Sequence, residues 1–313
     1  MQKTPYDLYA LVYKLHLTES KFEIAEDLRL KRLDSELTTT DISCLGPGNF
    51  DEFSLLSPYV RECTCEIQSF AQNNRQTRKA YMRTYLFSAL LNLRGFMAHR
   101  CIACIPFSWD TIAGREKRSK IAFDTPAQGK WEEQPNTRAF FNLPPYKPIL
   151  LDFYRSSHIV KGTSAKPFDG SDAQWFEKNF ATTESLYENS KVFELAMNYS
   201  TEWRFLQDKR AAIGYLWSGI ESFFDVPNEI TFRLSAMTAS LLEPRGLKRK
   251  EKFESIKKLY ALRSKAVHGK KMSEKELHEA MFESYYLLRA LLFWCLDNNR
   301  VLDKSDFDKA LFE

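Results

Sequence analysis

Beyond residue 172, the sequence consists almost entirely of segments whose apolar residues recur at helical spacing. We place helices near 173–187, 190–224 (which either runs through or breaks near Leu206), 229–242, 248–268, 274–296 and 304–312. Ser273, followed by Glu276, has the pattern of a capping box at the start of the fifth of these helices. Because each segment has an apolar stripe to bury, the pattern predicts an all-helical bundle.

Residues 1–165 have a different pattern, in which strands are prominent. Phe22–Leu33 alternates loosely, which favours a strand pair, and Tyr59–Phe70 alternates as a half-buried strand does, with Glu66 on its polar side. The remaining expectations are a turn at 46–49, a helix at 79–96, an extended segment at 102–109, a polar loop at 111–137 and an apolar run at 149–154 that fits helix or strand.

The segment 161–172 is polar and rich in Gly, Pro and Ser, as linkers often are. A chain of 313 residues is long enough for two domains. We therefore predict an α+β protein, with a strand-rich mixed α/β domain at 1–165 of unknown role and an all-α domain at 172–313.

Positive charge gathers in one part of the predicted bundle. Between Arg245 and Lys275 lie twelve Lys or Arg (245, 248, 249, 250, 252, 257, 258, 263, 265, 270, 271, 275) and three Glu (251, 254, 274). This excess of nine is larger than the net charge of +4 of the whole chain, so the remainder is acidic. Such a local field is the electrostatic footprint of a polyanion partner, although a solvated helix face has the same composition.

The basic helix ends with an arginine and a histidine five residues apart, Arg263 and His268, directly before Gly269. Gly269 is expected to adopt the left-handed conformation that terminates a helix. Five residues correspond to about 7.5 Å of rise and about 140° of rotation, so the two side chains diverge and a second helix has to complete any shared site.

The chemistry of the two side chains suits a phosphodiester. Histidine exchanges protons near neutral pH, and arginine offers a planar fork for phosphate oxygens. The alternative interpretation is a solvated Arg263 and a His268 that only caps the helix.

The motif Arg263-Ser264-x3-His268, an R-x4-H pattern within 259–269, resembles the signature of the HEPN superfamily and of its ApeA-like branch in particular. The segments 216–224 and 231–235 are similar to the preceding helices of that branch. The resemblance covers roughly the last 140 residues and does not extend to residues 1–165.

The resemblance implies a HEPN helical bundle that acts as a homodimeric, metal-independent endoribonuclease without a cofactor. The 2′-hydroxyl of RNA would attack phosphorus, with His268 as general acid/base and Arg263 stabilising the phosphorane. Glu221, Ser264 and Lys265 are expected to support them. The residues expected to bind the RNA backbone are Lys248, Arg249, Lys250, Lys270 and Lys271.

The same resemblance suggests bacterial antiviral (abortive infection) defence, with residues 1–165 sensing a phage-derived trigger, or a toxin held by an antitoxin. A different class of function stays open, namely a catalytically silent HEPN module that binds RNA, nucleotide or a protein partner. The sequence names neither the RNA that is cut nor the activator.

Two further expectations concern metals and membranes. The chain has six cysteines, of which Cys63, Cys65, Cys101 and Cys104 can be drawn as a zinc site, but the alternation around Cys63 favours a buried strand face and we predict no metal. The start has no apolar run of signal-peptide type, and the most apolar segment, 85–97, is too short to span a bilayer, so we expect a cytoplasmic protein without a membrane partner.

Overall fold

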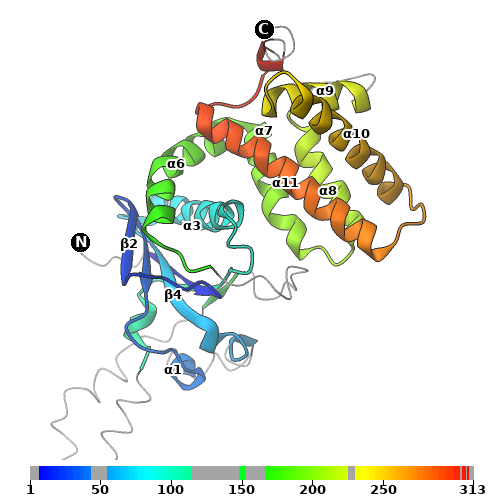
Figure 1. Cartoon of the computed structure of the whole chain (residues 1–313). Coiled ribbons are helices and arrows are strands. Elements are labelled where there is room, and N and C mark those ends of the chain that lie inside the picture. The colour runs from blue at the N-terminus through cyan, green and yellow to red at the C-terminus, as the bar shows by residue number, and fades with distance from the viewer. Residues whose placement is uncertain are drawn as a thin grey trace, which may run out of the picture. The chain divides into compact units, whose positions relative to one another are not determined.

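The computed structural model describes residues 7–43, 55–114, 148–151, 166–224, 230–303, 305–307 and 309 (Figure 1). Their contacts divide the chain into two units, the first ending at Phe180 and the second continuing from Ala181. The first unit contains a β-sheet and the second is helical, which confirms the predicted α+β fold with a helical C-terminal region. None of the helices in the described ranges has both the length and the apolar character needed to cross a membrane.

The sheet of the first unit has six antiparallel strands in the order β2-β3-β4-β1-β5-β6. The strands are β1 (Leu8–Tyr13), β2 (Lys21–Ala25), β3 (Leu28–Arg32), β4 (Cys63–Ser69), β5 (Arg100–Ile105) and β6 (Ile149–Leu150). The predicted strand pair within 22–33 is confirmed as β2 and β3, and the undecided run at 149–154 begins as a strand.

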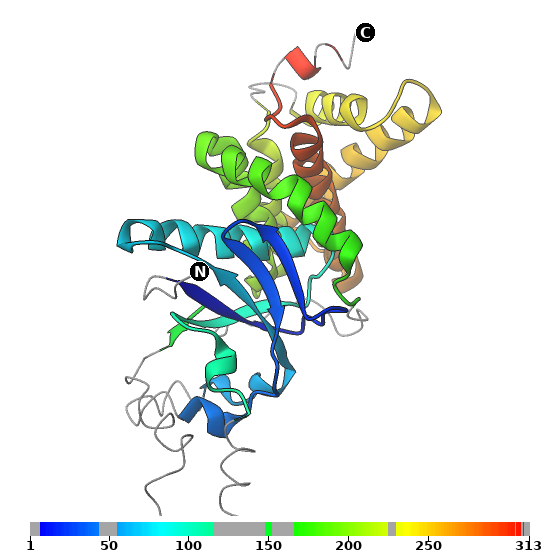
Figure 2. The same cartoon turned by 90° about the vertical axis from the view of Figure 1, so that its left-hand side faces the viewer.

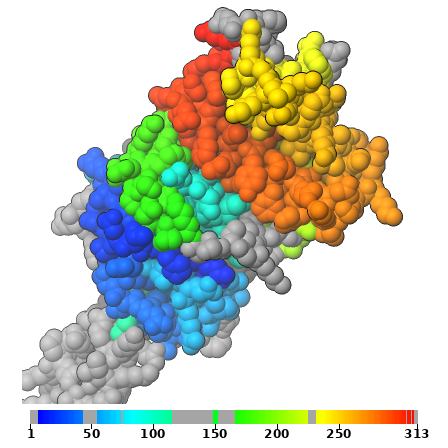
Figure 3. Space-filling model, in the orientation of Figure 1, coloured from blue at the N-terminus to red at the C-terminus, as the bar shows by residue number. Residues whose placement is uncertain are grey.

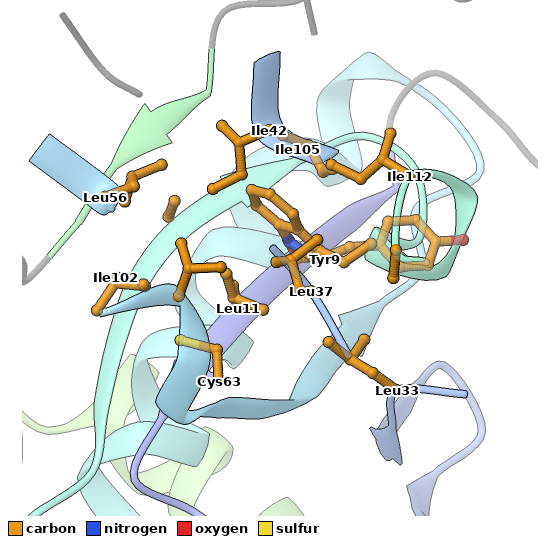
Figure 4. Packing of buried hydrophobic residues seen from close by; sticks show 14 of the residues in the cluster. Tyr9, Leu11, Leu33, Leu37, Ile42, Leu56, Cys63, Ile102, Ile105 and Ile112 are labelled. Atoms are coloured by element: carbon orange, nitrogen blue, oxygen red, sulfur yellow. The ribbon is translucent and has the colours of Figure 1, made fainter. Parts of the chain in front are cut away.

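Both faces of this sheet are covered (Figure 2). On one face, helix α3 (Asn74–Arg94) packs against β1 and β4, which confirms the helix predicted near 79–96. On the other, alternate residues of β1 point into an apolar cluster with α1 (Thr39–Ser43) and two 3-10 helices, η2 (Val60–Glu62) and η3 (Trp109–Thr111) (Figure 4). All six residues of β1 are buried, because this strand lies inside the sheet with both faces packed.

Strand β4 is buried on both faces, so the prediction of a half-buried strand was wrong. Glu66, expected on a solvated side, has no exposed surface. Its carboxylate accepts hydrogen bonds from the Ser108 hydroxyl (2.7 Å), the Trp109 backbone N–H (2.7 Å) and the Gln68 amide (2.6 Å). Ser108 and Trp109, 42 and 43 residues away, lie close by only in the fold, and the three donors offset much of the cost of burying the group.

Burial raises the pKa of Glu66 to about 7, although the three hydrogen bonds lower it. The folded chain therefore binds a proton more tightly than the unfolded chain, in which a glutamate has a pKa near 4.5. We expect the contribution of Glu66 to the free energy of unfolding to be fully present below about pH 4.5. It should fall by roughly 3 kcal/mol between about pH 4.5 and 7 and stay constant above about pH 7.

Thermal unfolding of the full chain between pH 4.5 and 8 measures this effect. Glu66→Gln should reduce the fall in melting temperature that accompanies rising pH. Glu26→Gln, in the exposed turn between β2 and β3, should leave this pH dependence unchanged. Equal slopes for wild type and Glu66→Gln would show that other groups cause the pH dependence.

The segment from 166 to 180, close to the predicted linker, packs as part of the first unit. Phe168 is fully buried against the rings of Phe22, Phe96 and Phe176. Asp172 is also buried and pairs with Arg94 (2.8 Å) and Lys166 (2.8 Å). The division between the units therefore falls inside α6 (Gly170–Asn189), beyond the polar segment 161–172, of which 161–165 lies outside the described residues.

The helices of the second unit follow the predicted segments. After α6 come α7 (Lys191–Glu202), the 3-10 turn η5 (Trp203–Phe205), α8 (Lys209–Glu221), α9 (Ile230–Leu242), α10 (Leu247–Val267) and α11 (Glu274–Asn298). The segment 190–224 is broken near Leu206, and Asp208 restarts it by accepting a hydrogen bond from the Arg210 N–H. The capping box of Ser273 and Glu276 is confirmed.

Helix α8 lies between α7, α10 and α11 and forms the centre of the second unit (Figure 1). Trp217 is fully buried, donates its ring N–H to the Ser284 hydroxyl (2.9 Å) and meets the Tyr260 ring edge-on (5.2 Å). A Cβ at Gly219 would come within 2.9 Å of Leu288 and Tyr199, so only glycine permits this close approach of three helices. Gly219 thus brings α7 and α11 close to α8, while the Trp217–Tyr260 contact packs α10 against it.

Other sequence expectations have mixed outcomes. The apolar stripe expected for this helix is buried at Ile256, Leu259 and Ala266 of α10, whereas the apolar Val267 in its last turn is 48% exposed. The predicted turn at 46–49 lies outside the described residues, as do most of the loop at 111–137 and most of the helix at 304–312.

Candidate functional site

The last turn of α10 ends in a complete C-terminal capping motif. Gly269 has a φ of +65°, as predicted for a left-handed terminator. Its N–H donates to the Ala266 carbonyl (3.2 Å), and the Lys270 N–H donates to the Lys265 carbonyl (2.9 Å). His268 caps the helix with its backbone, while its side chain is exposed. The imidazole is therefore displayed on a turn that does not need the His268 side chain to hold its conformation.

Arg210 of α8 holds this turn from outside the helix. Its guanidinium donates to the Ala266 carbonyl (3.2 Å) and to the Lys270 carbonyl (2.9 Å), one on either side of His268. Next to it, Lys209 pairs with Glu274 at the start of α11 (2.5 Å). Sequence analysis did not identify Arg210, because its partners are 56 and 60 residues away and no local spacing relates them.

Arg263 points in a different direction from His268, as the spacing predicted. Its half-buried guanidinium is directed at α8, where Nη2 lies 3.1 Å and 3.3 Å from the two carboxylate oxygens of Glu221. The same group lies over the Tyr260 ring, 5.5 Å from its centre. Within the described residues of one chain, no hydrogen bond or ion pair joins Arg263 to His268.

Of the two residues that Glu221 was expected to support, it pairs with Arg263 and, within the described residues, not with His268. Burial raises the pKa of the Glu221 carboxyl, and the positive charge of Arg263 partly opposes this shift. Only Nη2 of the guanidinium is engaged; in the described parts of the chain, Nε is buried without a hydrogen-bond partner and Nη1 has none either. The Nη1 group of Arg263 therefore keeps its donors for a second anion such as a phosphate oxygen, whereas the buried Nε does not face one.

The other predicted site residues lie along α10 and directly after it. Ser264 is half-buried one turn before His268, and Lys265 is exposed. Lys248, Lys250, Lys270 and Lys271 are exposed, so all four are available to a ligand. Arg249 is half-buried and donates from Nε to the Glu243 carbonyl at the end of α9 (2.9 Å), so it also has a structural role.

The cysteines drawn above as a possible zinc site are buried thiols of the sheet. Burial raises the pKa of Cys63 and Cys65 and brings that of Cys104 to about 12, which disfavours the thiolate that a metal needs. In the described ranges no group of three or more His, Cys, Asp or Glu is arranged to hold a metal ion.

No family model, no curated protein and no solved structure matches the chain, so the class of this site has to be inferred from its own geometry.

Proposed function

We propose that the chain is an endoribonuclease that cleaves RNA without a metal ion, with Arg263 and His268 as its catalytic residues. The observation that carries this proposal is the geometry at the end of α10. An exposed imidazole stands on a capped turn, and an arginine one turn earlier keeps the donors of its Nη1 group beside a basic surface. The R-x4-H resemblance supports the same assignment.

The proposed reaction is a transesterification within RNA. The 2′-oxygen forms a bond to the adjacent phosphorus, and the bond from phosphorus to the 5′-oxygen breaks. His268 exchanges the proton that leaves the 2′-hydroxyl or reaches the 5′-oxygen, and Arg263 stabilises the charge on the phosphorane oxygens. The products are a 2′,3′-cyclic phosphate and a 5′-hydroxyl, and DNA is not a substrate because it has no 2′-hydroxyl.

The proposal includes a homodimer, for a geometric reason. Arg263 is directed at α8 while His268 faces solvent at the helix end, so one chain does not focus both on one phosphate. A second copy of α10 across a two-fold axis would supply the missing partner for each site. The biological setting that we propose, antiviral defence or a toxin with an antitoxin, rests on the family resemblance alone.

Incubation of the pure protein with total RNA, with and without EDTA, tests the proposed activity. We expect cleavage that EDTA does not inhibit, products with 2′,3′-cyclic phosphate ends, and no cleavage of DNA of the same sequence. Light scattering on the same sample should give the mass of a dimer. RNA binding without cleavage would favour the alternative function, a catalytically silent binding module in which the Glu221 pair occupies Arg263 permanently.

A further inference from the structure

One flank of α10 carries His268 together with cations and an aromatic ring. At about 100° per residue, five residues fall within a sector of about 60°, and we call them the His268 flank. They are Lys250, Phe253, Lys257, Ser264 and His268. Glu251 and Glu254 fall outside this sector, so the flank is purely basic and neutral. Within this sector a polyanion meets only basic and neutral side chains, and the exposed Glu254 lies about 40° beyond its edge.

An exposed aromatic pair lies beside this flank. Phe232 of α9 is 60% exposed, which makes it the most exposed large aromatic side chain among the described residues. Its ring meets that of Phe253 edge-on, with centroids 5.6 Å apart, and Lys257 Nζ lies 5.8 Å from the Phe253 centroid. The α9–α10 hairpin forms part of the surface shown in Figure 3. A flat ring fixed next to a lysine is the arrangement with which proteins bind single-stranded nucleic acid.

We infer that Phe232, supported by Phe253, stacks a base of single-stranded RNA whose backbone follows the His268 flank to the catalytic end of α10. The inference rests on the proposed function and adds the substrate class, which is unpaired RNA. A duplex does not fit, because its bases are already stacked on one another and present no free face to Phe232. The positive charge of Lys250 and Lys257 favours RNA over an apolar protein partner at this surface.

The distance along α10 sets the length of RNA that can contact the aromatic pair and His268 at the same time. Phe253 and His268 are fifteen residues apart, which corresponds to about 22 Å along the axis. At a rise of about 3.4 Å per stacked nucleotide this distance spans on the order of six nucleotides. An oligonucleotide much shorter than this reaches either the aromatic pair or His268, but not both.

Binding of an RNA that cannot be cleaved tests the inference separately from catalysis. The probe is a fluorescein-labelled 12-nucleotide oligoadenosine with 2′-O-methyl groups, followed by fluorescence anisotropy with the full-length protein. Phe232→Ala should weaken binding about tenfold, the typical value of one stacked base. Phe232→Trp should retain affinity and Phe232→Leu should not, because leucine keeps the apolar surface without a ring face. A 12-base-pair duplex of the same length should not respond to any of these changes, because its bases present no free face to Phe232.

Tyr286→Ala is the matched control, because Tyr286 is an aromatic of α11 that is 49% exposed and lies outside the His268 flank. Equal affinity of wild type and Phe232→Ala for the 12-nucleotide probe would overturn the inference, even if the wild type cleaves RNA. Loss of the dimer in Phe232→Ala and Phe232→Leu alike, measured by light scattering, would overturn it too, and would assign the aromatic pair to a protein interface. If the wild type binds the 12-nucleotide probe in a Phe232-dependent way but does not cleave RNA, the result contradicts the proposed function and leaves the inference about Phe232 standing.

Discussion

Replacing His268 with alanine is expected to abolish RNA cleavage while the chain still folds and dimerises. The side chain is exposed, and the bonds that terminate α10 come from the backbone of Gly269 and Lys270, so the turn does not need the imidazole. Arg210 holds the same turn through backbone carbonyls as well. Removal of a general acid/base typically lowers the rate by about a hundred- to ten-thousandfold.

The measurement is the cleavage rate of a labelled single-stranded RNA, with circular dichroism and light scattering on the same preparation. His278→Ala is the matched control, because His278 is an exposed histidine of α11 whose ring packs on Phe282 (4.7 Å). This variant should cleave at the wild-type rate. Chelator-sensitive cleavage that persists in His268→Ala would contradict the mechanism and show that a metal-dependent activity is responsible.

Replacing Arg263 with alanine is expected to lower the cleavage rate by about a hundredfold or more, the usual cost of losing one donor to a charged transition state. Arg263→Lys should restore little of it, because lysine keeps the charge but lacks the planar set of donors that serves Glu221 and a phosphate together. The KM should change less than kcat, since the basic residues of α10 that we propose to bind the RNA backbone are unchanged.

A structural cost has to be separated from the catalytic one. Arg263→Ala leaves the half-buried Glu221 without its cation, and burial already raises the pKa of that carboxyl. The double variant Arg263→Ala, Glu221→Gln removes the unpaired charge, so it should regain thermal stability without regaining cleavage. Recovery of activity in the double variant would show that Arg263 serves only to neutralise Glu221.

Mixing the two inactive chains tests whether the site is shared. If each site takes Arg263 from one chain and His268 from the other, a heterodimer of Arg263→Ala and His268→Ala chains has one site with both residues intact. Mixed and re-annealed samples should then regain a substantial part of the activity, whereas each variant alone has none. No recovery in a confirmed heterodimer would place both residues of a site in the same chain.

The features that the sequence determined are those that depend on neighbouring residues. Apolar spacing predicted the helices of the second unit and the strand pair β2–β3, because periodicity and capping act within a few residues, and it left open the break that the structure has near Leu206. Gly269 predicted the end of α10, since a left-handed position there favours glycine. The divergence of Arg263 and His268 likewise follows from helix geometry alone.

The tertiary structure decided the contacts between residues far apart in the chain. Glu66 looked solvent-facing by alternation, yet donors from the β5–η3 region, more than 40 positions away, allow it to be buried. Arg210 reaches the carbonyls around His268 across 56 and 60 residues, and Glu221 meets Arg263 across 42. Local patterns determine which residues share a helix face, but only the packing of α8 against α10 determines which charges meet, because that pairing depends on the positions of whole helices.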